Sequence, residues 1–105
     1  MDKATALETL NKFRTVLEET GVPVSQLVLF GSFATGTFTE NSDIDVVVVS
    51  ESFKGLNHWQ RIEKMTEALY KLFQPIEARA LTPEEWESGN SITAMYAKTS
   101  TLITV

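Results

Sequence analysis

The sequence predicts an α/β fold, a small mixed β-sheet flanked by helices, and three observations lead to it. Two long segments, residues 3–20 and 58–74, carry apolar residues at steps of three and four, the spacing of a helix with one buried side. Apolar or alternating runs typical of short strands lie at 27–30, 43–50 and 76–81. The connection between the second and third runs contains a helix, which is how parallel neighbouring strands are joined.

The first half of the chain is expected to be a helix, a strand and a short helical turn. The helix over 3–20 has its apolar side at Ala4, Leu7, Leu10, Phe13 and Leu17. Gly21 and Pro23 end it. Gly31 ends the strand over 27–30, and Ser32 is expected to start a single helical turn with its hydroxyl as the N-terminal cap.

The second half begins with a polar loop at 37–42 and a strand over 43–50, which Ile44 and four valines mark as buried on both faces. The helix over 58–74 is expected to bury Trp59, Leu69 and Phe73 in the core. Pro75 stops it. His58, the sole histidine, stands at its start and is expected to cap it or face solvent.

The strand over 76–81 is expected to place Glu77 and Arg79 on one side, opposite its apolar residues. Thr82, Pro83 and Glu85 then form a strong helix start, with a threonine cap and a glutamate three positions later. The tail over 91–105 opens with a helical pattern at Ile92, Met95 and Tyr96 and ends in β-prone residues.

Length and composition limit the function. A chain of 105 residues is expected to form a single domain over 1–105. A net charge of −5 argues against a non-specific grip on nucleic acid, which needs clustered cations. The chain contains no cysteine and no apolar run near the ~20 residues of a membrane span. We therefore expect a cytoplasmic protein that does not bind membranes.

The residues that carry chemistry lie around one turn. Gly31 and Ser32 are followed, after a connection of ten residues, by Asp43, Ile44 and Asp45. Side chains two positions apart on a strand point to the same side, with Cα atoms roughly 7 Å apart, so both aspartates can reach one divalent cation. Gly31 lets an anion approach the main chain, and the N–H groups of the following helical turn favour a phosphate.

Parallel pairing would add a third acid to this pair. It brings the starts of two strands together, so Asp43, Asp45 and Glu77 converge at one edge of the sheet, and Gly31 reaches them if the first strand runs antiparallel. Three acids repel one another, and Mg²⁺, which takes carboxylate and phosphate ligands, would relieve the repulsion. A pair of such ions, ~3.5–4 Å apart, suits phosphoryl or nucleotidyl transfer.

The segment GSFATGTFTENSDID, residues 31–45, resembles the signature of the DNA polymerase β-like nucleotidyltransferase superfamily. The whole chain resembles the minimal nucleotidyltransferases of bacteria and archaea, and IEARALTPEEWESGN, residues 76–90, looks like their latter part. The resemblance implies Mg²⁺-dependent transfer of a nucleoside monophosphate, here AMP, from an NTP, here ATP, to a hydroxyl. It implies Asp43, Asp45 and Glu77 as catalytic metal ligands, and Gly31 and Ser32, beside the two aspartates, as nucleotide-binding residues.

The same resemblance implies a protein partner. Many such proteins act beside a helical HEPN-domain partner, as antitoxins that adenylylate it or cover it. A domain this small leaves one side of a nucleotide uncovered, so a homodimer or heteromer that completes the cleft is also expected. Family members often carry Arg where this chain has Thr35, and Arg79 and Lys54 are the cations that could replace it.

Two hypotheses therefore stay open. The chain is either an enzyme that modifies its partner or a binding module that neutralises a HEPN-type partner by contact. Each residue also has a plain structural interpretation: an Asp-X-Asp at a strand start is often a turn and cap, Ser32 alone can cap a helix, and Glu77 alone can be a solvated strand residue.

Overall fold

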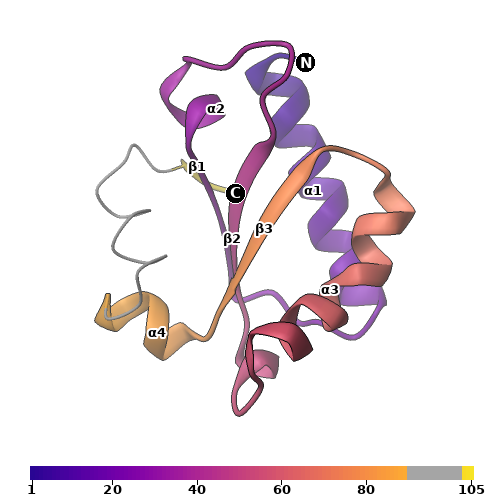
Figure 1. Cartoon of the computed structure of the whole chain (residues 1–105), viewed down its shortest axis with the longest axis vertical. Helices are drawn as coiled ribbons and strands as arrows, with labels where there is room; N and C mark the ends of the chain where they lie inside the picture. Colours follow the sequence, from indigo (N-terminus) through magenta and orange to yellow (C-terminus); the bar gives the residue numbers. More distant parts are fainter. Residues whose placement is uncertain (90–102) are drawn as a thin grey trace.

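The computed structural model describes residues 1–89 and 103–105. Its four-stranded sheet has the order β3-β2-β1-β4 (Figure 1). The strands are β1 (Gln26–Phe30), β2 (Ile44–Val49), β3 (Ile76–Leu81) and β4 (Ile103–Thr104). β1 is antiparallel to β2 and β4, whereas β2 and β3 are parallel. The predicted mixed sheet and both predicted strand orientations are confirmed.

The helices are α1 (Lys3–Glu19), α2 (Ser32–Thr35), α3 (His58–Leu72) and α4 (Pro83–Ser88), with a single 3₁₀ turn, η1 (Glu51–Phe53), after β2. In α1, Asp2 is the N-cap and accepts a 2.8 Å hydrogen bond from the N–H of Thr5, which lowers its pKa. The expected helical pattern over 92–96 lies outside the described residues. No helix in the described part of the chain is both long and apolar enough to cross a bilayer.

Strand β2 is buried on both faces, as its valines predict. One face of the sheet packs against α1 and α3 and includes Leu27, Leu29, Ile44, Val46 and Val48. The other face contains Val28, Phe30, Val47, Val49, Leu81 and Trp86 of α4. Figure 1 shows α1 and α3 on one side of the sheet and α4 on the other. Because β2 alternates between two apolar layers, residue 45 lies on the α4 side and residue 44 on the side of α1 and α3.

The apolar stripe of α3 is narrower than the sequence predicts. Met65 and Ala68 are its fully buried residues, and Leu69 packs at the edge of the core, but Trp59 is 74% exposed and Phe73 is 89% exposed. The prediction that these two aromatic residues are core is wrong. The helix ends at Leu72, and Phe73 takes a left-handed conformation with φ of 52° at the C-cap, which turns it off the buried stripe.

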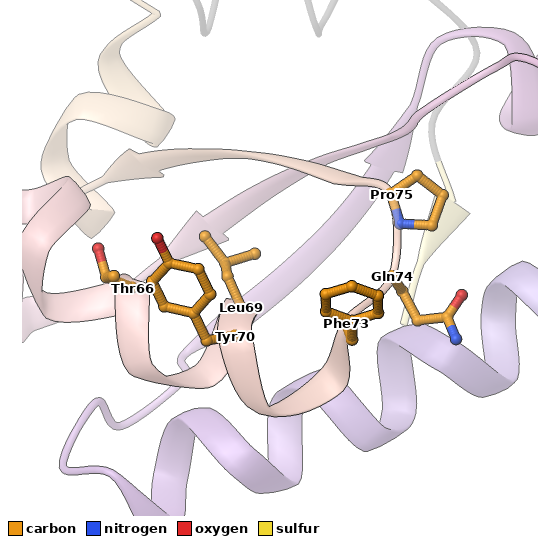
Figure 2. A pocket seen from close by; sticks show the side chains of 6 residues that line it. All are labelled: Thr66, Leu69, Tyr70, Phe73, Gln74 and Pro75. Atoms are coloured by element: carbon orange, nitrogen blue, oxygen red, sulfur yellow. The ribbon is translucent and has the colours of Figure 1, made fainter.

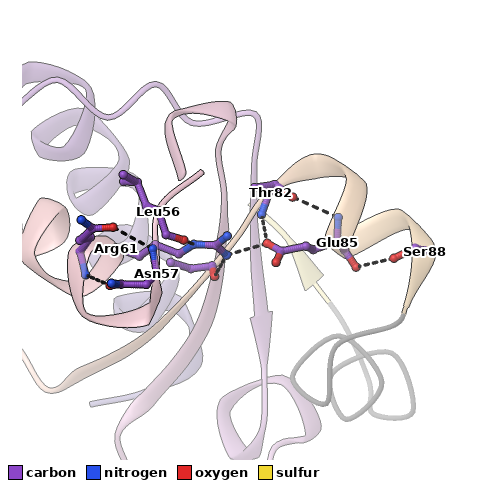
Figure 3. A network of polar contacts seen from close by, with 8 residues as sticks. Leu56, Asn57, Arg61, Thr82, Glu85 and Ser88 are labelled. Carbon is purple, nitrogen blue, oxygen red and sulfur yellow. Dashed lines mark hydrogen bonds and ion pairs between the residues drawn. The ribbon is translucent and has the colours of Figure 1, made fainter. Parts of the chain in front are cut away.

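A polar network ties the start of α3 to α4 (Figure 3). Arg61 donates to the carbonyls of Leu56 and Ala80, at 3.0 and 3.2 Å, and to Glu85 Oε1 at 2.6 Å. The same oxygen of Glu85 accepts from the N–H of Thr82, which closes the predicted capping box of α4. Burial of Glu85 raises its pKa, but the bonds from Arg61 and Thr82 outweigh this, and the pKa is lowered overall.

Candidate active site

Gly31 forms the corner between β1 and α2. Its φ of 74° and ψ of −153° are values that an L-residue adopts only under strain. Gly31 is the N-cap of α2, and Ser32 is the first helical residue, with no side-chain bond closing the cap. The predicted helical turn starting at Ser32 is confirmed, but the cap position falls on Gly31, because the chain needs glycine's conformation there.

The corner lies directly against Asp45. Phe30 is the register partner of Asp45, so Gly31 lies just beyond the paired position. A Cβ built on Gly31 would overlap Oδ2 of Asp45. Residue 31 must therefore lack a side chain for two reasons, its backbone conformation and the neighbouring carboxylate. The Gly-Ser turn and one of the predicted aspartates are brought together.

Asp45 and Glu77 form a cross-strand pair. They are direct partners in the parallel register of β2 and β3 and lie on the same face of the sheet. The pKa of Asp45 is raised from 3.8 to about 6, first by burial and then by the charge of Glu77 and a hydrogen-bonding contact with it. The charge of Asp43 raises it further, and Arg79 partly opposes the rise. The site therefore holds an excess of negative charge.

The sequence predicts that the strand begins at Asp43, but Asp43 stands one residue before β2 and is exposed. Its charge still acts on Asp45. Among residues 1–89 and 103–105, no three acidic, histidine or cysteine side chains are grouped closely enough to hold a metal ion. The donors nevertheless fit a divalent cation chemically, because Asp45, Glu77 and Asp43 supply hard oxygen ligands whose mutual repulsion a cation would relieve.

The structure separates the two cations that the sequence offers in place of the family arginine. Arg79 donates to Glu77 Oε1 at 2.8 Å and its charge reaches Asp45. Lys54 follows η1, beyond the opposite end of β2, and pairs with exposed Glu84 at 3.0 Å. Thr35 turns its hydroxyl back to Thr37 at 2.8 Å and to the carbonyls of Gly31 and Ser32 at 3.3 Å. Arg79 is thus the cation beside the carboxylates.

Sequence reasoning missed two features around these residues. Phe38, in the loop predicted to be polar, stacks on buried Phe33 of α2 with ring centroids 4.6 Å apart, which anchors the loop that leads to Asp43. An aromatic residue within a polar stretch was the available signal. A hollow of about 260 Å³ also lies beside Glu77 and Arg79, and His58 and Ile62 of α3 line its other side.

Comparison with known proteins agrees with this geometry. The family model of the nucleotidyltransferase domain matches residues 10–93. No curated protein matches the chain. Gly31, Asp45 and Glu77 all lie within the matched residues. The chain belongs to the nucleotidyltransferase domain family.

Solved structures share the fold. A presumed nucleotidyltransferase from Sulfolobus solfataricus is 21% identical with a TM-score of 0.56, over 79% of this chain and 78% of that one. A second presumed nucleotidyltransferase is 22% identical with a TM-score of 0.62, over 91% and 96%. A toxin–antitoxin structure with AMP-PNP contains a chain that is 27% identical with a TM-score of 0.50, over 67% of this chain and 55% of that one.

Proposed function

We propose that the protein transfers AMP from ATP to a hydroxyl group on a partner protein, with Mg²⁺ bound at Asp43, Asp45 and Glu77. The observation that carries this proposal is the contact of the Gly31 corner with Asp45, whose neighbour across the parallel register is Glu77. In this proposal the turn accepts the phosphates and the acid pair accepts the cation, and the contact of Gly31 with Asp45 places the two beside each other. A metal-bound nucleoside triphosphate presents phosphate oxygens and a cation side by side.

Each residue has a distinct proposed role. Gly31 gives the triphosphate access to the main chain, and Ser32 offers its hydroxyl and N–H at the start of α2. Asp43, Asp45 and Glu77 would hold one or two Mg²⁺ ions, which neutralise the phosphates and orient them for in-line attack. Arg79, which pairs with Glu77, would turn to a phosphate oxygen once that carboxylate binds a cation.

The bonds formed and broken in the proposed reaction balance. The acceptor hydroxyl oxygen forms a bond to the α-phosphorus of ATP, and the bond from that phosphorus to the bridging oxygen of the β-phosphate breaks. Pyrophosphate leaves with the bonding electrons. The hydroxyl proton passes to a carboxylate of the site or to water.

A protein acceptor is proposed for two reasons. A solved toxin–antitoxin structure with AMP-PNP contains a chain of this fold, so the fold occurs in such a pair. The resemblance to minimal nucleotidyltransferases implies a helical HEPN-type toxin as the partner. In this proposal the protein is a cytoplasmic antitoxin that adenylylates its toxin.

The test uses ATP labelled at one phosphate at a time. The protein is incubated with Mg²⁺, the product of the adjacent gene, and ATP carrying ³²P at either the α or the γ position. AMP transfer labels the partner from the α position alone, whereas label from the γ position would indicate phosphorylation and contradict the proposal. The double variant Asp43→Asn, Asp45→Asn should abolish labelling. Glu40→Gln, an exposed acid in the loop before Asp43, is the matched control and should leave it intact.

A second candidate is neutralisation by contact alone, with a weak metal site. The observation in its favour is that two side chains that could contact the phosphates already have other partners. Thr35 bonds to its own turn, and Arg79 is paired with Glu77. Partner binding with no label from either position, in the wild type and the double variant alike, would establish this candidate and exclude transfer.

A further inference from the structure

The outer face of α3 carries an aromatic surface that the proposed reaction does not use. Trp59, Tyr70 and Phe73 are 74%, 76% and 89% exposed. At about 100° per residue, Tyr70 lies roughly 20° around α3 from Trp59, so both belong to one face, and exposed Phe73 follows at the C-cap and lines the same hollow as Tyr70. Large aromatic residues gathered on one exposed face mark an interaction site more often than scattered ones do. We call Trp59, Ile62, Thr66, Tyr70 and Phe73 the α3 face.

The surface is hollowed at its C-terminal end. A hollow of about 530 Å³ is lined by Thr66, Leu69, Tyr70, Phe73, Gln74 and Pro75. Figure 2 shows these side chains following one another along α3 from Thr66 to Phe73, with Pro75 beyond them. The lining of this hollow has few polar atoms and no charged side chain, so the hollow suits an inserted apolar or aromatic side chain.

The position of this face separates it from the carboxylate site. α3 packs on the sheet face that contains Ile44, Val46 and Val48, whereas Asp45 and Glu77 belong to the opposite face. Ile62 is the point of nearest approach, because it lines the 260 Å³ hollow beside Glu77 and Arg79. A partner on the α3 face would border that hollow, whereas the Gly31 corner lies at the junction of β1 and α2. The surface requires an explanation of its own, independent of nucleotide transfer.

We propose that the α3 face binds a second copy of this chain through an antiparallel α3–α3 contact centred on Thr66. A two-fold interface must be self-complementary, so each residue has to meet its counterpart about one centre. With Thr66 at that centre, Trp59 of one copy lies level with Phe73 of the other, seven residues away on either side. Ile62 likewise lies level with Tyr70, four residues away on either side.

The two-fold arrangement pairs the exposed Trp59 of each copy with the hollow of the other copy. The exposed indole of Trp59, at the start of α3, is placed beside the hollow that Tyr70, Phe73 and Pro75 line at its end. Both copies do this at once, which gives two identical anchors. Thr66 is half-buried, with its hydroxyl bonded to the carbonyl of Ile62 at 2.9 Å, and its small side chain lets two helices approach at the crossing point.

The area that the aromatic side chains offer reaches the lower limit for a specific pair. An aromatic side chain buries 150–250 Å² when it is covered. The exposed parts of Trp59, Tyr70 and Phe73 therefore offer about 500 Å² on each chain, or about 1,000 Å² for two copies. That total reaches the lower limit for a specific interface before Ile62 and Pro75 are included.

The first test measures association. Light scattering and sedimentation from about 1 to about 200 µM should show a concentration-dependent dimer with a dissociation constant in the micromolar range. Tyr70→Glu and Phe73→Glu each place a charge in the contact and should weaken association by 100-fold or more. Both side chains are exposed, so the fold should be kept, which circular dichroism checks. Asn11→Glu, exposed on α1, is the matched control and should associate like the wild type.

The second test locates the two-fold axis. Because the chain has no cysteine, Thr66→Cys introduces a single thiol at the predicted centre, and mild oxidation should give a covalent dimer. Asn11→Cys should give little. A wild-type monomer at the highest concentration, a dimer that both glutamate variants leave intact, or equal cross-linking of the two cysteine variants would overturn the proposal. The proposal would also be overturned if the chain stayed monomeric and Trp59 became protected from a fluorescence quencher only when a different protein was added.

Discussion

The carboxylate of Asp45 occupies the space in which a side chain on residue 31 would begin, so Gly31 and Asp45 fit together only because residue 31 is glycine. This relationship joins the end of β1 to the start of β2 at the point where the candidate site forms. It also makes the site sensitive to the smallest possible substitution.

Gly31→Ala should destabilise the protein and weaken nucleotide binding. The new Cβ meets Oδ2 of Asp45, and the backbone is held at φ of 74°, so we expect a loss of about 2–4 kcal/mol in the free energy of unfolding. Urea denaturation measures the loss, and titration with ATP measures the binding.

Gly36→Ala is the matched control for Gly31→Ala. Gly36 has φ of 85°, but nothing lies within 4 Å of the position that a Cβ would take there, so it reports backbone strain alone, about 1 kcal/mol. Combining Gly31→Ala with Asp45→Ala should recover part of the larger loss, because the overlapping carboxylate is gone. Equal losses at the two glycines, with no recovery in the double variant, would show that Asp45 does not restrict residue 31.

The sequence predicted most of the fold because strong local signals agreed with the packing. The continuous apolar run of β2, the capping residues of α4 and the crossover helix between β2 and β3 each required one arrangement. The register of Asp45 with Glu77 followed from that crossover. Trp59 and Phe73 were misjudged because periodicity gives the buried side of a helix but not its width, and α3 buries only Met65 and Ala68 completely.

Details of side-chain packing could not be predicted in the same way. The antiparallel order of β1 and β2 predicted that Gly31 lies near Asp45, but not that the carboxylate fills the place of a side chain on residue 31. The stacking of Phe38 on Phe33, five residues earlier, likewise has no signature in the polar sequence around Phe38. Serine is a usual cap residue, yet Ser32 is the first residue of α2. The cap position falls on Gly31, because the corner there requires a positive φ. The roles of Asp43, Asp45 and Glu77 in metal binding remain predictions.

Asp45→Asn should stabilise the protein at neutral pH. The pKa of Asp45 is about 6 in the folded chain against 3.8 for a free carboxyl, so the folded state binds the proton more tightly. Stability is then lost as the pH rises from about 4 to about 6, and a neutral amide avoids this loss. After allowance for solvent screening of this half-exposed group, we expect a gain of about 1 kcal/mol at pH 7.5.

Denaturation at several pH values checks the sign of this effect. The advantage of Asp45→Asn over the wild type should shrink below pH 6 and disappear near pH 4, where the wild-type carboxyl is protonated. Glu40→Gln, an exposed acid in the preceding loop, should follow the wild type throughout. A variant that is less stable than the wild type at pH 7.5 would mean that Asp45 is paired with a cation in the folded protein.

Mg²⁺ should stabilise the wild type and its removal should reverse the effect. For a dissociation constant of about 1 mM, about 10 mM Mg²⁺ adds about 1.4 kcal/mol, which raises the melting temperature by several degrees. Asp45→Asn and Glu77→Gln should lose this response, whereas Glu40→Gln should keep it. Thermal melts in EDTA and in NaCl of matched ionic strength separate specific binding from screening. An equal response in all four proteins would contradict a metal site at these carboxylates.

Arg61→Met should destabilise the protein more than any other surface cation on α3. Arg61 is only 14% exposed, and its loss removes a donor from the carbonyls of Leu56 and Ala80 and leaves Glu85 Oε1 with the N–H of Thr82 alone. We expect about 2–3 kcal/mol in the free energy of unfolding, measured by urea denaturation. Lys64→Met, an exposed change of the same kind on α3, should cost less than about 0.5 kcal/mol.

The pH dependence of the Arg61→Met effect identifies its cause. Because Arg61 and Thr82 hold the pKa of Glu85 below 4.5 against the opposing effect of burial, their bonds stabilise the fold above that pH. This stabilisation is lost as the pH falls through the lowered pKa, so the difference between wild type and Arg61→Met should narrow in acid. A difference that stays constant from pH 7 to pH 3 would assign the loss to packing of the arginine stem and to the two carbonyls, with no contribution from Glu85.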